Sequence, residues 1–186
     1  EAAADAEGDP PPAGVGGAAA SSYSNVGYVL LAEAVARTTG TPLATFAKDR
    51  IFTPLGMADT LFWAGPEPSP PGAVQLDPRH PAPLSIGDGG LWSTAEDLLR
   101  WAEALDTDRL GITGLLQTPV LGYAWGMGVR EHAGHRIYRH GGSYADVRTM
   151  LVRVPGTGFD LVVLAARDRS ERRTDLTDRL LEALVT

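Results

Sequence analysis

Two side chains able to hydrogen-bond and move protons lie at the start of the first strongly patterned segment. Tyr23 and Asn25 are two positions apart, directly before an almost wholly apolar run over 26–32, and Asn25 is the only Asn in the chain. Asn and Ser are preferred at helix starts because they accept bonds from unpaired backbone N–H groups. A phenol beside a carboxamide also suits catalysis. Both interpretations remain open on these residues alone.

A second candidate lies in the C-terminal half, where His140-Gly141-Gly142-Ser143 follows a predicted strand over 136–139. Two glycines after a His allow another molecule to approach the backbone closely. Backbone N–H groups at such an edge can stabilise a developing oxyanion. The alternative is a glycine-rich bend in a hairpin with an incidental His, because glycines in strands often mark bends.

Composition argues against several other kinds of site. The chain has no Cys, which removes disulfides and thiolate chemistry, and its net charge of −7 disfavours nucleic acid as a partner. His132 and His135 flank a two-residue turn, but a four-ligand metal site needs more partners than this stretch supplies. We therefore expect no metal and no cofactor. No apolar run approaches the roughly 18 residues of a membrane span, so none is expected in this chain.

Helices are expected to position the first candidate. The pattern predicts a helix over 26–39 that ends at Gly40, and its residues are apolar nearly all round, which is typical of a buried element. A second helix is expected to begin after Thr41 as its cap. A third helix is expected to begin after Ser93, because Ser93 and Glu96 have the spacing of a capping box.

Strands are expected to position the second candidate, because the period changes to two from Tyr123 onward. A tight turn is predicted at 155–158 and a final helix over about 170–185. The fold class is therefore α+β, with helices followed by a three-stranded antiparallel sheet and a C-terminal helix. The strand patterns cover 123–129, 147–154 and 159–166, and a turn at 133–134 returns the chain through 135–138.

Two stretches have no such pattern. Residues 1–21 are mainly Ala, Gly and Pro, and we expect a disordered lead-in there because they cannot bury enough apolar surface. The 66–83 stretch is rich in Pro and is expected to be a long, stiff loop. The remaining 22–186 region is treated as one domain.

In combination, the motifs resemble the serine β-lactamase-related family, which contains class C β-lactamases, D-Ala-D-Ala carboxypeptidases and similar esterases. The resemblance runs from about Ser22 to the C-terminus and implies that 22–186 is a C-terminal portion of such a domain, with an incomplete β-lactamase/transpeptidase-like fold. The landmarks, in one order, are Tyr23-Ser-Asn25 before a helix, Thr53-Pro-Leu-Gly-Met57, Gly89-Gly-Leu-Trp-Ser-Thr94, and His140-Gly-Gly142 before two strands.

The resemblance also implies roles for the candidate residues. Tyr23 matches a tyrosine that moves the proton on and off the nucleophile and leaving group. A phenol of pKa about 10 needs a cationic neighbour for this task. Asn25 matches a residue that hydrogen-bonds the substrate amide. His140, Gly141 and Gly142 match the strand that lines the cleft, and the backbone N–H of Ser143 would be an oxyanion donor.

The sequence departs from the family at the nucleophile. The family uses a Ser-x-x-Lys located well before the Tyr-x-Asn loop. The only lysine here is Lys48, three residues after Thr45 and beyond that loop, and no serine has a lysine at that spacing. We therefore expect the chain to be inactive alone and to leave one sheet edge and one face open.

Three functional hypotheses follow. The first is part of a serine hydrolase that transfers an acyl group from an amide or ester, with a β-lactam, a D-amino peptide or a carboxylic ester as its substrate once an N-terminal half is present. The second is a non-catalytic module that binds peptides or peptidoglycan, or docks a partner. The third is one half of a two-chain enzyme. The sequence does not separate the three substrates and predicts no cellular location.

Overall fold

The computed structural model describes residues 23–64, 69–76, 85–167 and 172–185. They form two compact units, a helical unit and a sheet unit. The helical unit is Ser24–Trp101, and the sheet unit is Ala102–Thr186 together with the chain up to Tyr23. The lead-in expected over 1–21 and much of the 66–83 loop lie outside the described residues.

The first helix of the helical unit, α1 (Asn25–Thr39), has the ends that its sequence predicts. Ser24 is the N-cap, and its hydroxyl accepts a hydrogen bond of 3.1 Å from the Gly27 N–H. Gly40 follows the last turn with φ 69°, the left-handed conformation that glycine adopts without strain. Local capping chemistry therefore fixes both ends.

The prediction that α1 is buried is wrong. No residue of α1 is buried, and Val26, Leu30 and Leu31 expose 68%, 64% and 61% of their surface. An apolar helix is buried only where other elements cover it. Within the helical unit, the start of α2 and the loop at Ile86 cover one side of α1, so its other side remains exposed.

The next helical segment contains three short pieces. Its N-cap is Pro42, which makes no side-chain cap bond. The cap expected at Thr41 is therefore wrong by one residue. The segment ends at Gly56, which has φ 72°. The pieces are α2 (Leu43–Ala47), the π-helical turn η1 (Lys48–Phe52) and α3 (Thr53–Leu55).

A buried carboxylate ties the start of α4 (Ala95–Asp106) to the segment after α3. Asp97 is fully buried and accepts bonds of 2.8 Å each from the Asp59 N–H and the Thr60 hydroxyl. The capping hydroxyl is that of Thr94, which accepts from the Asp97 N–H at 3.2 Å. The expected capping box at Ser93 is therefore wrong by one residue, because the Ser93 hydroxyl bonds Thr60 at 2.7 Å instead.

Next to this tie, two short strands form a separate antiparallel ribbon, β1 (Leu61–Phe62) with β2 (Leu91–Trp92). Among the described residues, no helix combines the length and apolarity needed to cross a membrane.

The sheet unit confirms the α+β class, but its sheet has five antiparallel strands where three were expected. The pattern over 123–129 is split because Trp125 and Gly126 both have positive φ, 46° and 103°, so the chain turns between β3 and β4. The strand order is β3-β4-β5-β6-β7. The bounds are α5 (Thr113–Leu116), β3 (Tyr123–Ala124), β4 (Met127–His132), β5 (His135–Tyr144), β6 (Val147–Val154), β7 (Phe159–Ala165) and α6 (Arg172–Leu184).

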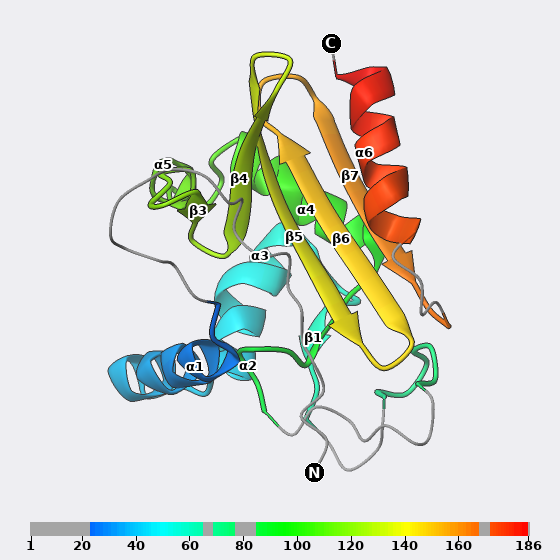
Figure 1. The fold of residues 1–186 in the computed structure, drawn as a ribbon. Helices are drawn as coiled ribbons and strands as arrows, with labels where there is room; N and C mark the ends of the chain where they lie inside the picture. Colours follow the sequence, from blue (N-terminus) through cyan, green and yellow to red (C-terminus); the bar gives the residue numbers. More distant parts are fainter. Residues whose placement is uncertain (1–22, 65–68, 77–84, 168–171, 186) are drawn as a thin grey trace. The chain divides into compact units, whose positions relative to one another are not determined.

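The core of the sheet unit lies between the sheet and α6, which runs along β6 and β7 (Figure 1). Alternate residues of the strands point to this side, as the pleat requires. The buried cluster consists of Ile137, Met150, Val152, Val154, Leu181 and Val185, with Phe159, Leu161 and Val163 packed against it.

The opposite face of the sheet carries a charged cluster. Arg153 is 1% exposed and pairs with Asp106 at the end of α4. Asp160 lies directly across from Arg153 on β7, and its buried Oδ1 has no hydrogen-bond partner among the described residues. Burial, reinforced by the nearby Asp106 carboxylate, raises the pKa of Asp160 from 3.8 to about 6, while Arg153 opposes the rise.

The first testable prediction concerns the buried tie at Asp97. Asp97→Ala is expected to lower the free energy of unfolding by about 2 to 4 kcal/mol, since it leaves the Asp59 N–H and the Thr60 hydroxyl without their acceptor. Glu96→Ala is the control, because Glu96 is exposed and shares only Arg100 with Asp97, and its cost should stay within about 0.5 kcal/mol. Urea unfolding of both variants measures this, and equal costs would contradict the role of Asp97.

The second prediction concerns Asp160 and pH. The folded state holds the Asp160 proton up to about pH 6, whereas the unfolded chain releases it near its ordinary value of 3.8. Between these values the folded state binds more protons, so this group's contribution to stability falls as pH rises. In Asp160→Asn the loss of unfolding free energy on raising the pH through this range should be smaller by about 1 to 2 kcal/mol, after allowance for solvent screening.

The measurement is the free energy of unfolding of wild type and Asp160→Asn at pH 4.5 and pH 7.5. The variant should gain stability relative to wild type at the higher pH only. Parallel pH profiles for the two proteins would contradict the assignment.

Candidate functional site

The Tyr23-Ser24-Asn25 segment leads into α1, with Ser24 in an extended conformation as the N-cap. Tyr23 is 39% exposed, and Asn25, half-buried, is the first residue of the helix. Because the Ser24 hydroxyl fills the capping role, the Asn25 side chain is not needed as the cap. The capping interpretation thus accounts for Ser24 and does not require the Asn25 side chain.

The His140–Ser143 motif lies inside β5, whereas the sequence placed it after a strand ending at 139. His140 is exposed and pairs across the sheet with Leu151. The strand continues through both glycines to a two-residue turn at 145–146, where Ala145 has φ 50°. The hairpin-bend interpretation is therefore wrong, because the ladder with β6 is regular through the motif.

The other edge of β5 is open along the same stretch. The pairing of β4 with β5 ends at Gly128 opposite Arg139, so no described strand lies beside 141–143 on that side. In an antiparallel hairpin with a two-residue turn, alternate residues direct their N–H groups away from the partner strand. Counting from Tyr144 paired with Val147, the N–H groups of Gly141 and Ser143 point to the open edge.

Gly142 has a steric reason to be glycine. A Cβ built on Gly142 would lie 2.5 Å from the Thr149 Oγ1 on β6, closer than any side chain tolerates. Thr149 therefore fills the space beside the glycine. Sequence analysis missed Thr149, although pairing residues outward from the turn at 145–146 would have placed it opposite Gly142.

Neighbouring side chains fix the end of the motif. The Arg148 guanidinium donates to the carbonyls of Ala145 and Val147 at 3.1 and 2.9 Å, which holds the turn after Tyr144. Burial raises the pKa of the Tyr144 phenol, so this hydroxyl stays neutral at physiological pH. The motif is thus a rigid backbone edge next to a neutral phenol.

The candidate residues are divided between the two units. Asn25 belongs to the helical unit, His140–Ser143 belong to the sheet unit, and the boundary falls between Tyr23 and Ser24. In the helical unit, Thr45 and Lys48 line a shallow cavity of about 190 Å³, and both side chains are exposed. Within the described part of the chain, no three His, Asp or Glu side chains are grouped as a metal site requires.

The third prediction tests the contact at Gly142. Gly142→Ala should cost about 1 to 3 kcal/mol of stability, because the new methyl group displaces the stiff, β-branched Thr149 side chain. Gly128→Ala in β4 is the control, since its Cβ would meet only an ordinary contact of 3.6 Å. Adding Thr149→Ala to Gly142→Ala should restore much of the loss in thermal unfolding. A double variant no more stable than Gly142→Ala would contradict this explanation.

Comparison with known proteins gives a consistent family. The Beta-lactamase family model matches residues 5–185. The D-alanyl-D-alanine-carboxypeptidase/endopeptidase AmpH of Escherichia coli K12 is 35% identical over 87 residues, which cover 44% of this chain and 22% of that protein. A D-aminopeptidase of Gluconobacter oxydans is 26% identical over 161 residues, covering 77% and 31% of the respective chains.

Solved structures show the same fold. The penicillin binding protein from Bacillus halodurans superposes with a TM-score of 0.70 at 24% identity, over 88% of this chain and 56% of that one. The D-amino acid amidase from Ochrobactrum anthropi SV3, complexed with D-phenylalanine, gives 0.67 at 24% identity, over 88% and 61%. The chain thus spans less than two thirds of the length of these relatives. Because one family model accounts for nearly its whole sequence, the chain belongs to the beta-lactamase family.

Proposed function

We propose that this chain is the C-terminal portion of a beta-lactamase-family serine hydrolase, and that polypeptide outside it supplies the serine and lysine of an acyl-transfer site. The open edge of β5 is the observation that carries the proposal. It directs the Gly141 and Ser143 N–H groups away from β6. A hydrolase needs such fixed donors where negative charge develops on the carbonyl oxygen.

The proposed roles follow from what each group can do. The Ser143 N–H is a donor to the oxyanion, and Gly141 and Gly142 belong to the open backbone edge along which the substrate lies. The Tyr23 phenol takes the proton from the nucleophile and returns it to the leaving group. The Asn25 carboxamide can both donate to and accept from a substrate amide. These roles require Tyr23 and Asn25 to converge with His140–Ser143 in the complete enzyme.

The chain does not supply the nucleophile. Without a serine held beside a lysine there is no acyl-enzyme. Ser143 is a poor substitute, because its proposed role uses the backbone N–H and no described base faces it. The proposed activity therefore belongs to the completed domain.

For the completed domain we propose an amide bond next to a D-amino acid as the substrate class. The relatives named above include a D-alanyl-D-alanine-carboxypeptidase, a D-aminopeptidase and a D-amino acid amidase. An extended D-amino peptide could lie along the edge of β5, where backbone groups are available for pairing. Carboxylic esters and β-lactams are the competing substrates in the assay.

The fourth prediction is that the purified chain does not hydrolyse D-phenylalanine amide, a chromogenic cephalosporin or a nitrophenyl ester, because it has no serine–lysine pair. Co-expression with the part of the Bacillus halodurans protein that lies outside the structural match should produce turnover of the D-amide. Turnover should fall at least about 100-fold with Tyr23→Phe, since proton transfer contributes on this scale. Tyr28→Phe, on α1, is the control and should keep activity.

Two results would overturn the proposal. One is hydrolysis by the chain alone that Tyr23→Phe abolishes. The other is a folded complex of the two polypeptides that binds D-phenylalanine amide without hydrolysing it, which would favour the binding-module hypothesis.

A further inference from the structure

We infer that the exposed face of α1 is the docking surface for the remainder of the family domain, meaning the polypeptide that the relatives have outside the stretch matched by this chain. This inference rests on the proposed function and identifies where the missing partner binds. The outer face of α1 is defined here by Val26, Leu30, Leu31 and Ala34.

The outer face is apolar and unusually exposed for its composition. Val26, Leu30 and Leu31 each expose more than 60% of their surface, and Ala34 is also exposed. Leu30, Leu31 and Ala34 lie four, five and eight residues after Val26, which places all four side chains on one side of the helix. Apolar side chains gathered in this way, rather than scattered singly, mark an interaction surface.

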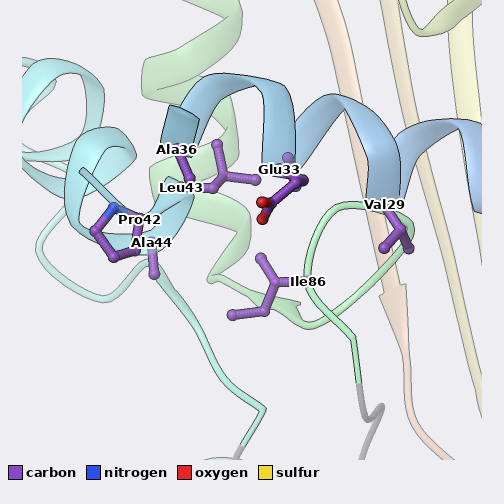
Figure 2. A pocket seen from close by; sticks show the side chains of 8 residues that line it. Val29, Glu33, Ala36, Pro42, Leu43, Ala44 and Ile86 are labelled. Atoms are coloured by element: carbon purple, nitrogen blue, oxygen red, sulfur yellow. The ribbon is translucent and has the colours of Figure 1, made fainter. Parts of the chain in front are cut away.

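The opposite side of α1 already has its partners. Val29, Ala32 and Ala36 line a groove shared with the start of α2 and with Ile86 (Figure 2). The loop reaches the helix at Gly87, where a Cβ would lie 2.6 Å from the Tyr28 carbonyl oxygen. One side of α1 is therefore fixed by backbone contact, and only the outer face remains for a partner.

The length of the relatives indicates the occupant. This chain covers 56% of the Bacillus halodurans protein and 61% of the amidase, so a large part of each relative has no counterpart here. Apart from Glu33, residues 26–36 of α1 are mainly apolar, as in a helix packed on several sides. Ala34 on the outer face is small, which allows another helix to approach closely.

The test measures docking without using catalysis. The probe is the part of the Bacillus halodurans protein outside the structural match, titrated into the full chain while hydrogen exchange of the α1 amides is followed. The outer-face amides should gain protection, and the two polypeptides should co-elute as a one-to-one complex. Leu30→Gln with Leu31→Gln should weaken binding by about 100-fold or more, because the transfer of two leucines out of water is lost. Leu115→Gln, an exposed leucine on α5, is the matched control and should bind like wild type.

Four outcomes would overturn the inference. Undiminished binding by the Leu30 and Leu31 double variant means that the partner docks elsewhere, and no binding by wild type means that the chain has no docking surface for it. A homodimer that dissociates on the double substitution means that a second copy covers the face. Strong protection of the outer face in the chain alone means that the chain covers it itself. A complex that forms through α1 but has no hydrolytic activity leaves the docking surface intact and contradicts only the proposed function.

Discussion

The register between β5 and β6 is the constraint on which the candidate site depends. It is set by the two-residue turn at 145–146 and is consistent with the close contact between Gly142 and Thr149. A shift of one residue would turn every side chain of β5 to the other face and reverse the direction of each N–H group. The N–H of Ser143 would then be used in the ladder with β6, and the open edge would present a different set of donors. The site is thus determined by strand pairing more than by the side chains that first drew notice.

Local chemistry was enough to predict parts of the structure. The ends of α1 follow from Ser24 and Gly40, because a cap and a left-handed glycine act within one turn of the helix. The turn between β6 and β7 was predicted from its Pro and Gly residues, and the helix after it from the spacing of its leucines. The short motifs also identified the family, since their order along the chain is more specific than any one of them.

Other features depend on contacts between distant residues and escaped prediction. The capping box moved from Ser93 to Thr94 because Thr60 competes for the Ser93 hydroxyl. The strand pattern from Tyr123 broke at Trp125, where a positive φ cannot be recognised from residue type. The burial of α1 was mispredicted. Its composition indicates that the helix packs against other elements, but it does not show whether this chain contains those elements. The convergence of Tyr23 and Asn25 with β5 depends on the placement of two units and remains a proposal.

The uncovered leucines of α1 also affect how such a polypeptide exists in a cell. Water-facing apolar surface on a folded chain is what chaperones and proteases engage, so a chain carrying it alone is held or degraded. Supply of the complementary polypeptide would then set the amount that accumulates. The same few side chains would act as a quality check, keeping the abundance of one half matched to that of the other.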